Sequence, residues 1–519
     1  MQFDAQYYNP DSAIGAPPVP EKLLMNGFTN LIYTKGKFQV GIRYENYLNV
    51  LQGFDARYQG QGITYRYATF DADFLTITVG NFYEQFGSGM IFRSFEERGL
   101  GLDNAMDGVR VKAHVLGGVY ATAIIGRQRT FFDYSEGIVR GFDGEINLNE
   151  TFKGISEAAL KVTLGGSYVS KYQKDEDPDF DLPENVGAWA ARGTILYKGF
   201  NLSGEYVYKI NDPQATNTLV VDGELRRNYN PGNGLLASLA YSRKGLGIVV
   251  GAKRIDNMDF RSDRGATGFN LNVNFLPALT KQHTYQLAAS LYPYATQPNG
   301  EWAFQAEVSY KVPRRSKVGG KYGMGIVLNY SQANGLINTI NAEGSGYTNN
   351  FFELGELYFR DFNVEISKKF TKKFKMTGKY LNLVYNGDVV QGLIGFGTIK
   401  SNIGIVDATY KIKSKHSLRL EVQGLWTQDR ADEGHWALAL LEYQWAPHMF
   451  VAVMNQWNYG NKDAAKRLHY PSITVGYIHN ATRITLGYGR QRAGIFCVGG
   501  ICRNVPASNG VSLSITSSF

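Results

Sequence analysis

The chain has 519 residues, of which 44% are apolar and 19% are charged, so it is an ordered protein with fewer charges than most soluble domains. Its 54 basic and 46 acidic residues give a net charge of +8, without the blocks of like charge that nucleic-acid-binding tails carry. No run of about 18 apolar residues occurs, which excludes transmembrane helices. Two cysteines are too few for a disulfide scaffold. The 59 glycines, 34 tyrosines and 30 phenylalanines suit an all-β protein, and a membrane barrel in particular.

Alternating apolar and polar residues are the strongest signal along the chain. Within 200–209 the even positions are mostly apolar, whereas the odd positions include a glutamate and a lysine, and 38–45 and 302–311 repeat the pattern. Because successive side chains of a strand point to opposite faces, each such segment has one apolar and one polar face. The predicted strands, in chain order, are 2–9, 24–34, 37–48, 60–71, 74–84, 106–116, 118–131, 138–150, 158–172, 186–197, 200–210, 233–243, 246–257, 267–276, 284–296, 300–312, 322–333, 355–369, 374–386, 398–412, 416–428, 434–446, 448–459, 468–479, 482–492 and 509–519.

The connections between these strands alternate in length. Short ones such as Lys35-Gly36 and Lys198-Gly199 alternate with longer polar ones such as 173–185 and 211–232. Short turns at one rim and long loops at the other are typical of outer-membrane barrels. Closure removes the sheet edges, and closure in lipid satisfies both the apolar and the charged faces. We therefore expect one domain, residues 1–519, that forms a single large transmembrane antiparallel β-barrel of about 26 strands (roughly 22–26).

The alternation also assigns the two faces of the barrel wall. We expect Tyr206 and Phe304 to face lipid, and Glu205 and Glu307 to face the lumen. The wall of the lumen then carries charges of both signs, which favours a hydrated interior with little selectivity by charge. The predicted lumen wall consists of Arg43, Glu45, Glu205, Lys209, Glu307, Lys311, Arg419 and Glu421.

Residues 84–105 break the strand rhythm. Acidic and basic side chains are dense there, and four glycines allow the chain to bend tightly. We expect this segment to fold into the lumen and narrow it; an ordered surface loop held by ion pairs is the alternative. The predicted constriction uses Glu84, Arg93, Glu96, Glu97, Arg98 and Asp103.

Two stretches carry a family resemblance. The first contains GNFYEQFGSG at 80–89, and the second contains CVGGICRNVPA at 497–507. Together with the C-terminal Phe519, they resemble an uncharacterised family of Bacteroidota outer-membrane β-barrel proteins, a domain of unknown function. The resemblance implies a barrel in the outer membrane and brings no catalytic residues. The alternating last strand that ends on Phe519 is similar to the assembly signal that the barrel-assembly machinery reads.

Cys497 and Cys502 enclose Val-Gly-Gly-Ile, a spacer whose two glycines allow a hairpin that brings the sulfur atoms together. Thiols oxidise outside the cytoplasm, so we expect a disulfide. The pair has no nearby histidine to complete a metal site, and its spacing is not the redox motif C-x-x-C. No zinc-binding histidine motif or G-x-S-x-G motif occurs, so we expect no metal, no cofactor and no enzymatic activity.

A barrel of this width leaves a water-filled lumen unless something plugs it, which favours a hydrated channel for hydrophilic solutes. The alternative is a barrel scaffold or partner subunit of an outer-membrane secretion or envelope-assembly complex. The expected location is the bacterial outer membrane. Because residues 1–4 lack the basic and apolar regions of a signal peptide, we interpret the sequence as a mature chain from which that peptide was removed.

The expected partners follow from this location. They are outer-membrane lipid, the barrel-assembly machinery during biogenesis and proteins that bind the long loops. We expect no nucleic-acid partner, because the basic residues are dispersed along the chain.

Overall fold

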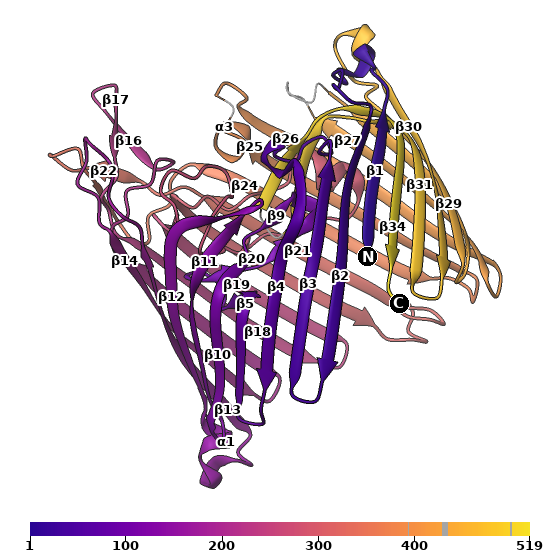
Figure 1. The fold of residues 1–519 in the computed structure, drawn as a ribbon. Coiled ribbons are helices and arrows are strands. Elements are labelled where there is room, and N and C mark those ends of the chain that lie inside the picture. The colour runs from indigo at the N-terminus through magenta and orange to yellow at the C-terminus, as the bar shows by residue number, and fades with distance from the viewer. Residues whose placement is uncertain (393, 428–433, 499–500) are drawn as a thin grey trace.

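The computed structural model describes residues 1–392, 394–427, 434–498 and 501–519, and it forms a closed antiparallel β-barrel (Figure 1). Twenty-four strands make the barrel, and each pairs with the barrel strand that follows it in the chain. The last barrel strand, β34 (Ser508–Ser517), closes the ring against the first, β1 (Gln2–Tyr8). The others are β2 (Leu23–Lys35), β3 (Phe38–Leu48), β4 (Gly60–Asp71), β5 (Leu75–Phe82), β10 (Met106–Leu116), β11 (Val119–Thr130), β12 (Asp133–Asn147), β13 (Leu160–Tyr172), β14 (Asn185–Tyr197), β15 (Phe200–Lys209), β18 (Gly232–Arg243), β19 (Leu246–Asp256), β20 (Gly300–Val312), β21 (Met324–Asn334), β24 (Leu357–Lys369), β25 (Phe374–Asn386), β26 (Thr398–Lys413), β27 (His416–Thr427), β28 (Trp436–Trp445), β29 (Met449–Trp457), β30 (His469–His479) and β31 (Thr482–Gln491).

The all-β barrel fold is confirmed, but two of the predicted strands, 267–276 and 284–296, are wrong. Both lie in residues 257–299, between β19 and β20, where the regular element is the short helix α2 (Gln286–Leu291). Leu271 has a left-handed backbone (φ 56°), which a strand does not tolerate. Pro293 has no N–H group to give to a strand ladder. Apolar residues therefore alternate in this segment without forming strands.

The remaining predicted strands agree with the structure to within a few residues. Both ends of the chain lie at the same rim, where the amino group of Met1 donates to the carbonyl oxygen of Ser517 (2.8 Å). This follows from the even number of strands. Three predicted details lie outside the described residues: the strand end Gln428, the two glycines between the cysteines and the loop residue Leu393.

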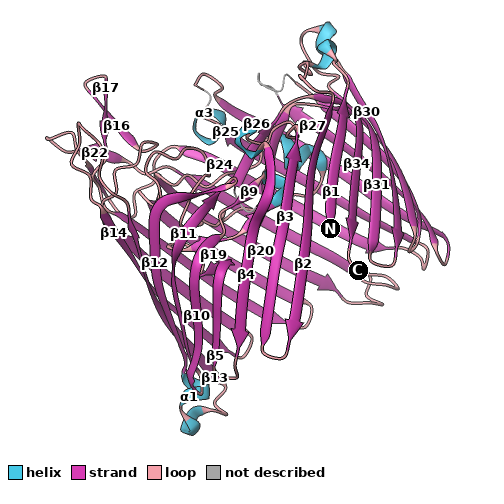
Figure 2. Ribbon diagram, in the orientation of Figure 1, coloured by secondary structure: helices cyan, strands magenta, loops and turns pink. Residues whose placement is uncertain are grey.

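Short hairpins and helices lie beyond or within the ring of strands (Figure 2). None of the helices in the described part of the chain is long and apolar enough to cross a membrane. The hairpins are β6 (Glu84–Gln85) with β7 (Arg93–Ser94), β8 (Glu96–Glu97) with β9 (Leu102–Asp103), β16 (Thr218–Val221) with β17 (Glu224–Arg227), β22 (Asn338–Ile340) with β23 (Tyr347–Asn349), and β32 (Gly494–Val498) with β33 (Ile501–Val505). The other helices are α1 (Leu148–Thr151), α3 (Gly387–Val390) and the single 3-10 turns η1 (Ser12–Ile14), η2 (Ala56–Tyr58), η3 (Arg98–Leu100), η4 (Lys153–Ile155) and η5 (Ala464–Lys466).

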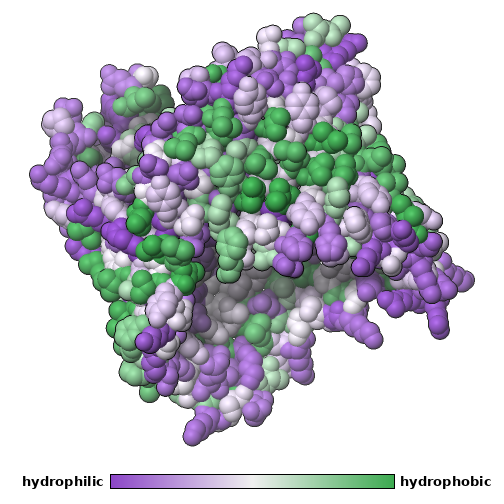
Figure 3. All heavy atoms as spheres, turned by 45° about the vertical axis from the view of Figure 1, so that its right-hand side comes forward, coloured by the Kyte–Doolittle hydropathy of each residue, from purple (hydrophilic) through white to green (hydrophobic). Residues whose placement is uncertain are grey.

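The outer face of the barrel carries an apolar band between hydrophilic rims (Figure 3). Tyr206 is 48% exposed on this face, as are Leu420 (48%) and Val422 (47%) on β27. Phe304 lies on the same side of β20 as Trp302, whose ring stacks on it and whose indole N–H donates to a loop carbonyl oxygen. Exposed apolar side chains in a continuous band are what a barrel in lipid presents to its surroundings.

Candidate functional site

Residues 84–105, which we call the first inner segment, leave the wall between β5 and β10 and lie against the inner face of the barrel (Figure 1). Its apolar centre, residues 90–92, is fully buried in one cluster with inward-facing side chains such as Val207. The backbone N–H of Ser88 donates to the carboxylate of Glu205 on β15 (2.8 Å). The segment therefore reaches a strand far from the two strands that it connects.

Five charged side chains meet where the first inner segment touches the wall. Arg43 and Glu45 belong to β3 and Arg129 to β11, whereas Glu96 and Asp103 belong to the segment. Nε of Arg43 is 2.7 Å from Glu45, its Nη1 is 3.0 Å from Glu96, and its Nη2 contacts Asp103. Nη2 of Arg129 is 2.6 Å from Glu45, and its Nη1 is 2.5 Å from Asp103. We call this group the charge cluster; it ties the segment to two strands through buried ion pairs.

The charge cluster is a poor metal site despite its three carboxylates. One oxygen each of Glu45, Glu96 and Asp103 lies within 4.8 Å of the others, a spacing that a cation could bridge. Two guanidinium groups, of Arg43 and Arg129, already contact these carboxylates. A further positive charge there would meet two fixed cations, so the arrangement favours an ion-pair network over a metal centre.

The other predicted constriction residues are distributed along the same segment. Glu84 is 2.6 Å from Lys112 on the neighbouring wall, and Arg98 is 2.7 Å from Glu96. Glu97 accepts a hydrogen bond from the amide of residue 99 at the start of η3 (3.2 Å). Arg93 stacks between two phenylalanine rings, at 4.4 and 4.1 Å from their centroids, and burial lowers its pKa. That these side chains narrow a pore stays a prediction.

Residues 257–299, which we call the second inner segment, contain the two wrongly predicted strands 267–276 and 284–296, and they also lie against the inner face. Its polar groups bind inward-facing side chains on strands from β20 to β27. These contacts are Lys281 with Glu307, His283 Nε2 with Asp361 (2.8 Å), the Tyr285 hydroxyl with Asp407 (3.3 Å) and the Leu287 amide with Gln423 (3.0 Å). The two inner segments also meet, because the Asn274 side chain donates to the carbonyl oxygen of Met90 (3.1 Å).

Helix α2 anchors the second inner segment through apolar packing. Leu287 and Leu291 are buried in one cluster with inward-facing residues of β25–β28, including Ile403, Ile405 and Leu438. Apolar side chains that point into a water-filled lumen would be unfavourable, and the packing of α2 onto this part of the wall removes them from water. The inner face is thus filled by protein on this side.

Most of the predicted lumen-wall residues bind the inner segments or each other. Glu205 and Glu307 bind one segment each, as described above, and the Nζ of Lys209 donates to the carbonyl oxygen of Asp259 (2.8 Å). Arg419 pairs with Asp407 (3.0 Å) and contacts Glu421 on the same wall. Lys311 is exposed and lines a cavity of about 670 Å³ near the short-turn rim. The inner wall therefore carries charges of both signs, and much of its charge is paired.

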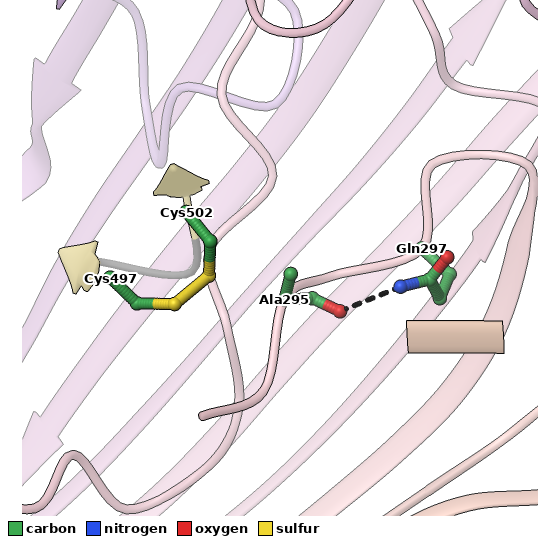
Figure 4. The surroundings of a disulfide bond; sticks show 4 residues. All are labelled: Ala295, Gln297, Cys497 and Cys502. Atoms are coloured by element: carbon green, nitrogen blue, oxygen red, sulfur yellow. Dashed lines mark hydrogen bonds between the residues drawn. A yellow bond between two sulfur atoms is a disulfide. The ribbon is translucent and has the colours of Figure 1, made fainter. Parts of the chain in front are cut away.

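The disulfide between Cys497 and Cys502 is present, in the hairpin β32–β33 (Figure 4). Ala295 and Gln297 of the second inner segment appear in the same view, joined by a hydrogen bond (3.0 Å). Just before the hairpin, Arg492 donates to the carbonyl oxygen of Ser290 at the end of α2 (2.8 Å). The hairpin therefore folds inward over the second inner segment.

Two neighbouring cavities line the inner wall formed by β1, β34, β31 and β30. One is about 210 Å³ and is bordered by Ser472 and Ser512; the other is about 390 Å³ and is bordered by Arg98 and Arg503. Four residues border both cavities, namely Gln6, Tyr8, Gln491 and Ser508. The smaller cavity is lined mainly by small and neutral polar side chains, whereas the larger one combines Asp4, Arg98 and Arg503 with aromatic and aliphatic side chains.

Sequence reasoning missed the second inner segment, Arg129 and Arg503. The first had one visible signal: residues 259–264 carry two aspartates and two arginines, a charge density like that of the first inner segment. Arg129 and Arg503 had none, because only the folded chain shows which basic side chains meet the inner segments.

Comparison with known proteins adds family membership. No curated protein matches the sequence. Among solved structures, the chain is similar to the translocation pore of the P pilus usher PapC, at 10% identity with a TM-score of 0.46, over 99% of this chain and 98% of that one. It is similar to the siderophore receptor PirA from Pseudomonas aeruginosa at 9% identity, with a TM-score of 0.42, over 100% and 79%. It is also similar to the outer membrane protein OpdK from Pseudomonas aeruginosa, at 11% identity with a TM-score of 0.33, over 77% of this chain and 96% of that one. Scores this low carry no argument about activity. A family model covers residues 1–519 in full, and the chain belongs to that family, a family of unknown function named DUF6029.

Proposed function

We propose that this protein is a channel for hydrophilic solutes in the bacterial outer membrane, with a lumen narrowed by its two inner segments. The apolar outer band and the charged inner wall support a membrane setting, because each face then meets a matching environment. Bacterial membrane barrels of this kind, with an even number of antiparallel strands, occupy the outer membrane. The Bacteroidota origin, the absence of enzymatic activity and of cofactors, the assembly partners and the removal of a signal peptide stay predictions.

The observation that carries the proposal is the pair of adjoining cavities along β1. Together they border the wall from Ser472 on β30 to Arg98 on the first inner segment. The inner segments cover the wall opposite with apolar side chains, whereas the smaller cavity on this wall is lined mainly by small and neutral polar ones. A solute path along β1 therefore needs no exposure of the apolar clusters.

A planar-bilayer recording tests this proposal. The purified full-length barrel, inserted into a bilayer, is expected to give discrete conductance steps. The steps should be smaller than an unfilled barrel of this width would give, because two segments occupy its interior. An assembled barrel that never conducts would contradict the proposal.

The scaffold function is a second candidate, and one observation favours it. Apolar side chains are exposed on the hairpin β16–β17 outside the wall, namely Val220 (62%) and Leu225 (74%). Exposed apolar groups away from lipid are typical of protein-binding surfaces. A stable partner recovered with the wild-type barrel in mild detergent, and lost when both side chains are replaced by serine, would support this function.

A further inference from the structure

We propose that the cavity of about 390 Å³ beside Arg503 binds a small organic carboxylate. This inference deepens the proposed channel function, on which it rests, by naming the class of solute. The cavity lies between the hairpin β32–β33, the loop 49–59, strand β1 and the turn η3.

Arg503 is the group that marks the cavity as a site. Its Nε and Nη1 atoms are buried and have no hydrogen-bond partner among the described residues. The guanidinium group lies 4.1 Å from the centre of the Phe54 ring, and a Cβ atom on Gly53 would come within 2.8 Å of Nη1. Phe54 and the backbone of the loop thus hold the guanidinium group in place while its Nε and Nη1 atoms lack a hydrogen-bond partner.

The pKa of Arg503 agrees with an uncompensated cation. Burial lowers it, and the opposing influence comes from the hydroxyl of Tyr8 rather than from a carboxylate. A buried charge without a partner costs free energy, and a bound anion would remove that cost.

Two other charged groups border the cavity. Arg98 is paired with Glu96 (2.7 Å) and donates to the side-chain oxygen of Gln2 (2.9 Å). Asp4 accepts a hydrogen bond from the side-chain amide of Gln2 (2.8 Å), a neutral partner, so it keeps its negative charge. Arg503 is the cation of the cavity whose Nε and Nη1 donors are unused, and it is the group that the anionic end of a ligand would contact.

The rest of the lining points to an organic anion rather than a bare inorganic one. Aromatic and aliphatic side chains make up much of the cavity, and its volume falls in the range of small-molecule sites. The apolar members are Tyr8, Phe28, Leu51, Phe54, Phe496, Val505 and Pro506. A carboxylate can accept charge-assisted hydrogen bonds from Arg503 while an attached ring packs against these side chains.

The test is a calorimetric titration of the full-length barrel in detergent with benzoate, its uncharged analogue benzamide and inorganic phosphate. Benzoate is expected to bind more tightly than either of the other two, because it alone offers both a carboxylate and an apolar ring. Arg503→Gln should weaken benzoate binding about tenfold or more, as expected for the loss of a hydrogen bond to a charged group. Arg226→Gln, on the exposed hairpin β16–β17, is the matched control and should bind like the wild type.

Several results would overturn the proposal. Benzoate binding that is unchanged in an assembled Arg503→Gln barrel would remove the role of the arginine. Should that variant fail to assemble, the wild type still decides: benzamide that binds as tightly as benzoate excludes an anion site, and phosphate that does so excludes an organic one. Arg503-dependent binding by a barrel that does not conduct supports this site and contradicts the channel. Conductance without benzoate binding contradicts this site alone.

Discussion

In the charge cluster, the guanidinium group of Arg129 joins Glu45 on the wall to Asp103 on the first inner segment. All three side chains are buried, so neither carboxylate has water as a substitute partner. A buried ion pair adds little net stability by itself, but removing one member leaves a charge without compensation. The cluster is thus a point at which one substitution can loosen the first inner segment.

We expect Arg129→Met to lower the free energy of unfolding by about 3–5 kcal/mol, because Glu45 and Asp103 then share Arg43 alone and one buried negative charge is left without compensation. Thermal unfolding of the full-length barrel in detergent measures the change. Lys174→Met is the matched control, since Lys174 forms an exposed ion pair with Glu176 (3.0 Å) and such pairs contribute little. Equal melting temperatures for the Arg129→Met variant and the wild type would contradict a structural role for the cluster.

For single residues, the sequence predicts which face of the wall a side chain occupies but not which residues it contacts. Alternation along β3 places Arg43 and Glu45 on the inner face, and charge density singles out Glu96 and Asp103. Their meeting depends on how the first inner segment bends, and several glycines with positive φ set that path. Arg129 looks like any other inward-facing basic residue until the segment is in place.

At the scale of elements, the two inner segments behave differently from the strands around them. A barrel strand pairs with its neighbours in the chain and turns its apolar face to lipid, so a local alternation of side chains is enough to predict it. The second inner segment also alternates, but its apolar residues pack onto inward-facing side chains of β25–β28, which lie far away in the sequence. This is why 24 of the strands could be predicted and residues 257–299 were mistaken for two more.

We expect deletion of residues 87–101 to raise the permeability of the barrel to large solutes, because it removes the apolar centre of the first inner segment from the lumen. The second inner segment remains, so the gain should be limited. Swelling of liposomes in sugars of increasing size measures it, and deletion of 219–226 from the exposed hairpin β16–β17 is the control. A folded deletion variant with unchanged permeability would show that the segment is no constriction, and would favour the scaffold function.

In the molecule as a whole, neighbouring residues of a strand lie in different surroundings: one side chain faces the outer apolar band, and the next faces the inner segments. Val422 on β27 is 47% exposed on the outer face, whereas Gln423 beside it is buried and binds the second inner segment. The strand contacts lipid on its outer side and the second inner segment on its inner side. The barrel is therefore stabilised by its contacts with the inner segments as well as by the hydrogen bonds between its strands.

We expect Val422→Arg to destabilise the barrel by about 2–4 kcal/mol, because it places a charge on the lipid-facing side near the middle of a strand. Leu418→Arg, on the same face of β27 but close to the short-turn rim, should cost about 1 kcal/mol or less, since the penalty falls near the membrane interface. Urea titration of the barrel refolded into lipid vesicles gives both values. Equal costs at the two depths would contradict the placement of the outer band in a membrane.

We propose that solutes pass along the wall formed by β30, β31, β34 and β1, beside the two inner segments. Both cysteines of the chain are in the disulfide, so a single engineered cysteine can be labelled selectively. The measurement is single-channel conductance before and after a charged thiol reagent, for Ser512→Cys at the smaller cavity and for Ser331→Cys, a fully buried position on β21. We expect labelling to reduce the conductance of the Ser512→Cys barrel and to leave that of the Ser331→Cys barrel unchanged. A conducting Ser512→Cys barrel that is labelled without any change in conductance would contradict it.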